Sequence, residues 1–500
     1  MWKKISPFLI ILITVLFLYH PVLFTYFSQD DFFHFKVSQT DGSLTEFIKL
    51  FGFYPFEKRG IAFYRPLSRE IPFNLYYSIF GLNHFPFRIF TMIIHFVNIY
   101  LVFLLVQKLF KNKFLSFFTS FFFGITAANV ATLYYLAGGI QTLLATAFVL
   151  LSLLFFYHYI ETSSVKFKII SLLFFLLGIS SHEQTLITPF LIFGLGIILK
   201  LNKRKVAVDT LPFFCFAGLL VLIEVFKMGF SSQEKQYQAI FSIKTAINSL
   251  FWYSNWALGI PETLIDFVSP GLRLNPTLLR YWSNYYILIF PAFFISTVLL
   301  FIATSYLFIK MRGVFIERRF LFNLIWFPLG LLPVILLPLH KSTHYLPISL
   351  PAFWVLIGYI IFSFYKELRK KRIILAKIFM SLVIISLTVL SSTSAILGST
   401  NYWAANRGKL AEKLLNQVKK TYPNLPKGTA LYLKNDPNYP YLTKEWGKAS
   451  KQAAYILNGS DALQLLYNDP TIKVFYEDLG ELPKDLSEKK VYSIIVKIYD

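Results

Sequence analysis

The chain opens with MWKKISPFLIILITVLFLYHPVLFTYFSQDDFFHF (residues 1–35), in which two acids follow a long apolar run. An apolar run of about 20 residues is long enough to cross a lipid bilayer as a helix. No small-residue cleavage site ends the run, so we expect an uncleaved first span and not a signal peptide. Asp30 and Asp31 come directly after it, among phenylalanines. The stretch therefore predicts a membrane protein with two carboxylates at the edge of its first span.

The composition of the whole chain supports the same conclusion. Hydrophobic residues make up 56% of the sequence and charged residues only 15%. A soluble protein has no need of so much apolar surface. The net charge of +23 is compatible with nucleic-acid binding, but the basic residues form short clusters between apolar segments, which is typical of cytoplasmic loops. We therefore expect membrane lipid, and no nucleic acid, as the surroundings of this chain.

The apolar segments predict an all-α multi-span membrane protein with about eleven transmembrane helices, at ~20 residues per span. They are residues 5–24, 86–107, 114–134, 139–160, 167–181, 184–200, 206–229, 282–309, 319–339, 345–365 and 373–397. The stretch SSHEQT (residues 180–185) splits one apolar region into two short halves. A re-entrant pair of helices is an alternative there.

The basic clusters predict the orientation of the spans. With this count of spans, every cluster falls on the same side as the N-terminus. The positive-inside rule makes that side cytoplasmic. The loops 25–85 and 230–281 and the tail 398–500 then lie outside the cell or in a lumen.

The outer segments carry structure of their own. Residues 43–51 place four apolar side chains on one helical face, which is typical of a helix lying in the membrane interface, and residues 233–258 have a similar pattern. We divide the chain into a transmembrane domain, residues 1–397, and a small soluble α/β domain, residues 398–500. The predicted elements of that second domain are helices at 406–420 and 448–459 and strands at 428–435, 472–478 and 489–500.

The acidic pair is the first candidate for chemistry. Acids at the end of a span are often simply solvated. Here the neighbouring phenylalanines bury Asp30 and Asp31 partly, which raises the pKa of a carboxyl group and makes it a better base. Either acid fits the role of base, and we prefer Asp31 slightly because it lies deeper among the phenylalanines.

The stretch FYRPLSREIPFN (residues 63–74) supplies two arginines on the outer side. Arg65 and Arg69 suit a phosphate, because a guanidinium group donates two parallel hydrogen bonds. An internal pair of Arg69 with Glu70, or of Arg65 with an aspartate, is an equally good explanation.

A second group of cationic residues lies in LPLHKSTHYLP (residues 337–347). Lys341 and His344 fall on the outer side, against the usual bias of charge, so we expect them to bind an anion. A solvated loop remains the alternative.

Four further polar residues have open roles. Glu183 and His182 could accept from a sugar hydroxyl, bind a metal together, or join two half-helices. His95 and Asn98 lie inside the second span, where polar groups usually face other helices. We expect helix–helix hydrogen bonds there, with ligand contact as the alternative. Arg88, at the start of that span, is expected to snorkel to the interface.

Several familiar signatures are missing from the sequence. It has no closely spaced metal-binding motif, no glycine-rich phosphate loop before a helix and no Cys–His pair. We therefore predict no metal ligands and no certain cofactor, while dependence on a divalent metal stays open. Cys215 is the single cysteine, so an internal disulfide is excluded.

Four stretches together resemble the GT-C superfamily of membrane glycosyltransferases. After the acidic pair, the sequence YRPLSREIPFNLYYSIFGLNHFPFRIFTMIIHFVNIYLVFLL (residues 64–105) is the most specific of them. The similarity is greatest to protein O-mannosyltransferases and to the transmembrane, tetratricopeptide-containing O-mannosyltransferases. The weaker stretches are residues 134–157, residues 180–192, which resemble a Ser-Lys-Glu motif, and residues 344–358.

The resemblance implies transfer of a hexose or pentose from a polyprenyl-phosphate donor to an acceptor on the extracytoplasmic face. It makes Asp30 or Asp31 the base or the group that positions the acceptor, and it places Glu183 and His182 at the Glu and Lys of the Ser-Lys-Glu motif. Ala131, Gly139 and Gln141 stand where the family has an acid, an arginine and a second acid. Mannose therefore does not follow as the donor sugar. The acceptor, whether protein, lipid or cell-envelope glycan, stays open, because the tail has no tetratricopeptide repeats.

Two other classes of function compete with a glycosyltransferase. A flippase or transporter of lipid-linked glycans usually shows internal symmetry and broken helices at mid-membrane. The sequence shows no such symmetry, and its polar groups gather in the outer loops. A non-catalytic membrane scaffold is the third alternative, and the departures from the family motif are what favour it.

Overall fold

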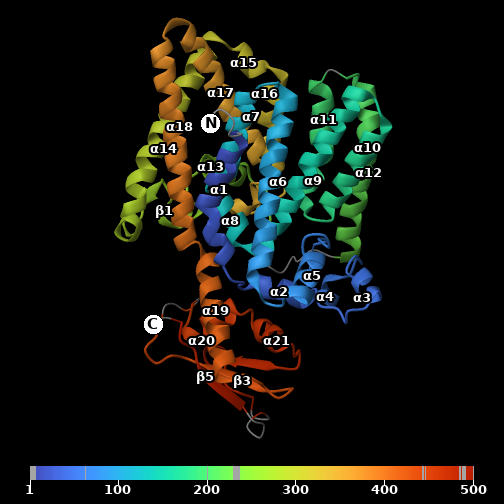
Figure 1. The fold of residues 1–500 in the computed structure, drawn as a ribbon, viewed down its shortest axis with the longest axis vertical. Coiled ribbons are helices and arrows are strands. Elements are labelled where there is room, and N and C mark those ends of the chain that lie inside the picture. Colours follow the sequence, from blue (N-terminus) through green and yellow to red (C-terminus); the bar gives the residue numbers. More distant parts are fainter. Residues whose placement is uncertain are drawn as a thin grey trace, which may run out of the picture.

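The fold is a bundle of long helices with a small sheet below one end, as Figure 1 shows. The computed structural model describes residues 7–61, 63–199, 201–228, 237–441, 444, 446–483, 486 and 491–498. Within these residues the chain is mostly helical.

Among the described residues, six helices are long and apolar enough to cross a membrane. They are α6 (His84–Phe110), α9 (Leu136–Thr162), α12 (Lys203–Ile223) with η4 (Glu224–Met228), α14 (Thr277–Lys310), α17 (Leu350–Lys371), and α18 (Ile373–Asn401) running on into α19 (Trp403–Thr421). Shorter apolar helices cover Phe8–Phe24, Lys113–Ile125 and Glu183–Ile198. These helices indicate an integral, multi-pass membrane protein, as the sequence predicts.

The other predicted spans are shorter helices. Among them are α10 (Val165–Ile179) and α16 (Arg318–Gly330), so the count of about eleven spans stays a prediction. The predicted span 319–339 is wrong over its second half, because α16 ends at Gly330 and the chain then turns. Pro333 lies in those turns, and a proline lacks the N–H that continues a helix. The span predicted from residue 345 begins at Leu350, after η7 (Thr343–Tyr345).

The first outer loop folds into four short helices at the lower edge of the bundle (Figure 1). They are α2 (Asp30–Val37), α3 (Leu44–Lys49), α4 (Phe56–Arg59) and α5 (Glu70–Phe80). In α3 the side chains of Leu44 and Ile48 are 72% and 59% exposed. The predicted amphipathic helix is therefore present, and its apolar face is uncovered by the protein.

The second outer loop contains α13 (Ile243–Leu258), η6 (Glu262–Phe267) and a short hairpin of β1 (Val268–Ser269) and β2 (Arg273–Leu274). The predicted amphipathic stretch 233–258 matches α13 from residue 243 on. Its first residues, 233–236, lie outside the described residues.

The end of the chain, residues 403–498, forms what we term the C-terminal unit. Its described elements are α19, β3 (Ala430–Lys434), α20 (Ala449–Ile456), α21 (Asp461–Tyr467), β4 (Lys473–Tyr476), η8 (Glu477–Leu479) and β5 (Val491–Ile495). The three strands pair in parallel in the order β4-β3-β5. The predicted helices and strands are present, and α21 is an addition that the sequence did not predict. Residues 489, 490, 499 and 500 of the last predicted strand lie outside the described residues.

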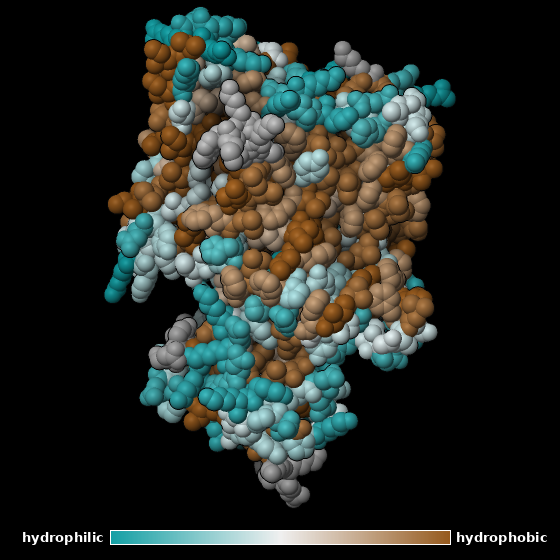
Figure 2. Space-filling view, viewed as in Figure 1, coloured by the Kyte–Doolittle hydropathy of each residue, from teal (hydrophilic) through white to brown (hydrophobic). Residues whose placement is uncertain are grey.

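Surface hydropathy divides the molecule along its long axis. Figure 2 shows a brown, apolar band over the helical bundle, with teal residues at its upper edge and over the C-terminal unit. The α6–α7 connection, where α7 (Lys113–Ile125) begins, and the α17–α18 connection lie at the upper end (Figure 1). These connections carry basic clusters, so the charge asymmetry seen in the sequence runs along the axis of the bundle.

One glycine permits a close approach between α8 (Asn129–Tyr134) and α9. A Cβ atom added at Gly139 would lie 1.7 Å from the carbonyl oxygen of Thr132. A backbone atom cannot move aside cheaply, so no larger residue fits this position. An arginine, which the resemblance to GT-C enzymes would predict here, is therefore excluded by the packing of the backbone.

We expect Gly139→Ala to destabilise the protein by several kcal/mol, or to prevent folding, because the clash is with backbone. Gly218→Ala in α12 is the matched control: nothing lies within 4 Å of the added Cβ, and alanine is favoured over glycine in a helix by about 1 kcal/mol. Thermal unfolding in detergent measures both variants. Equal melting temperatures in the two variants would contradict the packing described.

Candidate functional site

A cavity of about 490 Å³ opens at the lower end of the bundle. Its walls come from both outer loops, the start of α9, the loop before α17 and the start of α19. Of the predicted residues, Asp30, Arg65, Arg69, His182, Lys341 and His344 line it. Asp31, Glu183, His95 and Asn98 do not. The cavity thus brings together six of the ten residues selected from the sequence.

The two acids point in different directions because a tight turn precedes α2. The N–H of Asp31 donates to the carbonyl of Ser28 at 3.1 Å. The Asp31 carboxylate then accepts from the N–H of Ser28 at 3.0 Å and from the N–H of Ala137 at 2.7 Å. Asp31 is only 2% exposed. It therefore joins this turn to the start of α9.

Asp30 faces the cavity instead. Its carboxylate accepts a hydrogen bond from the Tyr135 hydroxyl at 2.6 Å. The acid that reaches the cavity is thus Asp30, whereas the sequence favoured Asp31 slightly as the base. The deeper acid has its oxygens occupied by backbone donors.

Arg88 joins the segment that leads into the two acids to the segment that leads into Tyr135 and Ala137, which bond them. Its guanidinium donates to the carbonyls of Thr25 and Tyr26 at 2.9 and 3.2 Å, and to those of Leu133 and Tyr134 at 3.0 and 3.1 Å. The side chain is 0% exposed. The expectation that Arg88 snorkels to the interface is wrong, because buried carbonyls need its donors.

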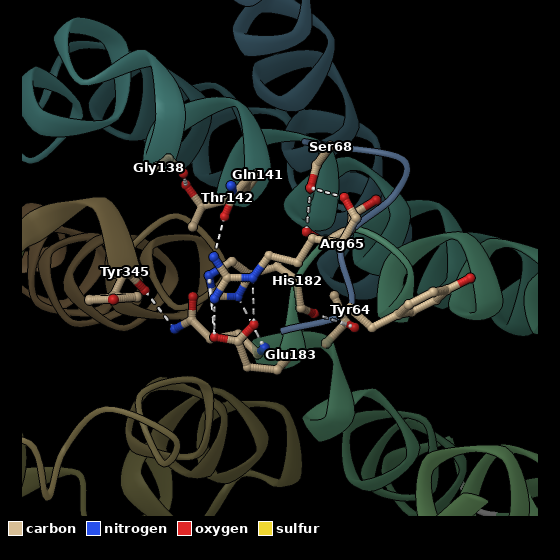
Figure 3. A network of polar contacts seen from close by, with 12 residues as sticks. Tyr64, Arg65, Ser68, Gly138, Gln141, Thr142, His182, Glu183 and Tyr345 are labelled. Carbon is tan, nitrogen blue, oxygen red and sulfur yellow. Dashed lines mark hydrogen bonds and ion pairs between the residues drawn. The ribbon is translucent and has the colours of Figure 1, made fainter. Parts of the chain in front are cut away.

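A bidentate ion pair forms another wall of the cavity (Figure 3). Arg65 Nε donates to one Glu183 oxygen at 2.9 Å, and Nη2 donates to the other at 2.6 Å. Arg65 Nη1 donates to Gln141 Oε1. The pair joins the first outer loop to the junction between α10 and η3 (Glu183–Ile187). Arg65 lines the cavity, but its charge is balanced by Glu183.

Arg69 is also paired within its own loop. Its Nη2 donates to Glu70 at 2.8 Å and to the carbonyl of Phe63 at 2.7 Å. The side chain is buried. The structure thus supports the alternative in which Arg69 and Glu70 shape the loop, although Arg69 still borders the cavity.

The loop before α17 presents a second set of polar groups. Lys341 Nζ donates to Asn248 Oδ1 at 2.8 Å, and His344 Nδ1 lies 2.9 Å from Ser342 Oγ. Burial lowers the pKa of Lys341, and burial together with nearby His340, His182 and Arg65 lowers the pKa of His344 well below its usual value. His344 is therefore a neutral imidazole at pH 7.

Three of the residues predicted from the sequence hydrogen-bond to other groups of the protein. His182 borders the cavity, and its Nδ1 accepts from the N–H of Gln184 at 3.1 Å. His95 Nε2 lies 3.2 Å from the carbonyl of Gly124, and Asn98 Nδ2 donates to the carbonyl of Leu143 at 2.9 Å. Both His95 and Asn98 are 0% exposed. They make the helix–helix hydrogen bonds expected of polar groups inside a span.

Several cavity residues were missed in the sequence. Tyr135 and Gln141 were not selected, although they bond Asp30 and Arg65. Trp403 and Arg407 come from α19 and also line the cavity. Most of the chain separates them from Asp30 in the sequence. The polar pattern of α19 predicts a soluble helix and does not indicate contact with a cavity at the membrane edge.

A metal site has no counterpart in the part of the chain that the structure describes. No group of three or more His, Cys, Asp or Glu side chains lies close enough to hold an ion. Glu183 and His182, which the sequence offered as a metal pair, lie 3.7 Å apart (Nε2 to Oε1). Glu183 also pairs with Arg65, and His182 Nδ1 accepts from the N–H of Gln184.

Sequence comparisons identify no relative. A scan against protein-family models finds no match, and a search of curated proteins finds none.

Solved structures do resemble the chain. One is the archaeal oligosaccharyltransferase AglB from Archaeoglobus fulgidus in complex with an inhibitory peptide and a dolichol-phosphate, with 12% identity, a TM-score of 0.47 and coverage of 96% of this chain. The apo form of the Archaeoglobus fulgidus enzyme and its complex with zinc and sulfate each show 13% identity and a TM-score of 0.47, over 86% and 90% of this chain. The chain spans 66%, 63% and 61% of the lengths of these three structures. A similarity this low does not establish the function of this chain.

We expect the Arg65–Glu183 pair to show strong coupling in a double-mutant cycle. Arg65→Met or Glu183→Leu alone leaves a largely buried charge without its partner, at a cost of about 3–5 kcal/mol, whereas the double variant removes both charges and recovers much of that loss. Chemical unfolding in detergent measures the cycle. Additive losses would contradict the pairing.

The raised pKa of Asp31 should make the stability of the protein depend on pH. Burial raises the pKa of Asp31 to about 7, against the lowering effects of Arg88 and of the Ser28 and Ala137 N–H groups. The folded state then keeps a proton that the unfolded state releases near pH 4, so the stability due to this group falls as pH rises from about 4 to about 7. The melting temperature of wild type should therefore fall relative to that of Asp31→Asn as pH rises through this window. Above the window the difference between the two melting temperatures should stay constant. A difference that does not change with pH would contradict the shift.

Proposed function

We propose that this protein is an integral membrane glycosyltransferase that moves a sugar from a polyprenyl-phosphate donor to an acceptor on the extracytoplasmic side. The observation that carries the proposal is the cavity itself. Its lining includes the Asp30 carboxylate together with Lys341 and His344, and the described residues include helices long enough to span a bilayer. The sequence resemblance to GT-C enzymes supports the same chemistry.

The proposed orientation follows from the distribution of charge. The α6–α7 and α17–α18 connections, which carry basic clusters, lie at the end of the bundle away from the C-terminal unit (Figure 1). By the positive-inside rule that end, with the N-terminus, is cytoplasmic. The cavity and the C-terminal unit then face the extracytoplasmic side.

A lipid-linked donor suits a cavity at this depth. Its prenyl chain stays in the bilayer, so its phosphate must lie at the level where the spanning helices end. Lys341 supplies a positive charge there, and the His344 and His340 imidazoles lie on the same wall. Arg65 and Arg69 border the cavity but are balanced by Glu183 and Glu70. We therefore assign the donor phosphate mainly to Lys341, with His344 as a neutral hydrogen-bonding partner.

Asp30 is the proposed general base. It takes the proton from an acceptor hydroxyl as that oxygen bonds to the anomeric carbon of the donor sugar. The bond from the anomeric carbon to the phosphate oxygen breaks, and the electron pair leaves with polyprenyl phosphate. Lys341 stabilises the charge that develops on this phosphate. Tyr135 holds Asp30 in place through its hydroxyl.

We expect Asp30→Asn to reduce sugar transfer by about 10²–10⁴-fold, because a positioned general base contributes that much to the rate. The variant should fold, since Asp30 lies at the cavity surface. Release of polyprenyl phosphate from synthetic donors carrying mannose, glucose, galactose or arabinose measures the activity. Glu57→Gln is the matched control, because Glu57 is an exposed acid of the same loop.

Two results would count against the proposal. Full activity of folded Asp30→Asn would remove Asp30 from the role of base. Movement of labelled donor across vesicles without any glycosidic product would instead favour a lipid-linked glycan flippase.

A further inference from the structure

The residue before Asp30 has an unusual backbone. Gln29 has φ 51° and ψ −113°, a combination that glycine adopts readily and other residues rarely. It occupies the second position of the Ser28–Asp31 turn, and primed turns require a positive φ there. Holding a non-glycine residue in such a conformation costs on the order of 1–3 kcal/mol and needs support from its surroundings.

The C-terminal unit supplies that support. The N–H of Gln29 donates to the carbonyl of Ile456 at 2.8 Å. Ile456 is the last residue of α20, where carbonyls have no partner within the helix. The side chain of Gln29 accepts from Arg407 Nη1 in α19. Both the main chain and the side chain of Gln29 are thus bonded to the C-terminal unit.

Arg407 is itself held in place. Its guanidinium lies 5.0 Å from the ring centroid of Trp403 and 5.4 Å from that of Trp446, within the range of cation–π attraction. The next residue, Gly408, brings α19 close to the chain before the turn: a Cβ atom there would lie 2.6 Å from the carbonyl oxygen of Tyr26. These contacts leave the guanidinium little freedom.

We propose that the C-terminal unit clamps Gln29 through Arg407 and Ile456, and that this clamp aims Asp30 into the cavity. The direction of Asp30 depends on the ψ angle of Gln29, one peptide bond away. Gln29 and Arg407 are then positioning residues, and the transfer centre is complete only when the C-terminal unit is docked. This inference rests on the proposed function.

The decisive variant is Gln29→Gly. Glycine removes the strain, so the protein should be at least as stable as wild type. It also removes the bond to Arg407 and widens the range of backbone angles open to residue 29, so Asp30 is aimed less firmly. We therefore expect kcat to fall by about 10²-fold while the KM for the donor changes little. A purely structural role would not lower kcat in a protein that is more stable. Gln39→Gly, in the segment after α2, controls for added chain flexibility.

Arg407 gives the second pair of variants. Arg407→Gln should lower kcat as Gln29→Gly does, and Arg407→Lys should restore part of it by keeping the charge over the indole rings. Lys409→Gln, an exposed residue of the same helix, controls for loss of a positive charge. Wild-type kcat in both Gln29→Gly and Arg407→Gln would overturn the clamp.

Amide hydrogen exchange separates the clamp from the proposed function. The Asp31 N–H closes the turn, so its exchange should be faster in Gln29→Gly and Arg407→Gln than in wild type. If wild type releases polyprenyl phosphate from none of the synthetic donors, the proposed function fails. The exchange rate of the Asp31 N–H then still tests the clamp by itself. Unchanged exchange in both variants would overturn it.

Discussion

The candidate site depends on one buried guanidinium. Arg88, near the start of α6, binds the carbonyls of Thr25 and Tyr26 on one side and those of Leu133 and Tyr134 on the other. The first segment leads into the Asp30 turn, and the second leads into Tyr135 and the start of α9. A buried arginine needs all its donors satisfied, so these two segments cannot separate without leaving them unpaired. The contact between Tyr135 and Asp30 follows from that constraint.

Other polar contacts complete the cavity from distant parts of the chain. The Arg65–Glu183 pair brings in the α10–η3 junction, and Glu262 bonds Ser342 and Thr343 and so fixes the loop that carries Lys341. The C-terminal unit adds Arg407 through Gln29. Charges that the sequence suggested for substrate binding thus divide into two groups. Arg65, Arg69 and Glu183 are paired within the protein, whereas Asp30 and Lys341 are the cavity residues that we propose for contact with the substrate.

The sequence predicted the helices well because their signal is local. Apolar runs and interrupting charges identify α6, α9 and α18 without any knowledge of their neighbours. The apolar sequence continues beyond α16, but the helix ends at Gly330, before Pro333. An apolar pattern alone therefore does not give the end of a helix. The sequence identified the acidic pair but not which acid faces the cavity. Asp31 is turned away because it accepts from the N–H of Ala137, which lies in another helix. Gln29 and Arg407 were missed for the same reason: their partners lie far away in sequence.

The most direct test of the central claim is an experimental structure of the protein with polyprenyl phosphate bound. We expect the phosphate to lie in the cavity, within hydrogen-bond reach of Lys341, with Asp30 facing the position that the sugar would occupy. A lipid bound along the outside of the bundle, with its phosphate remote from Lys341 and Asp30, would contradict it.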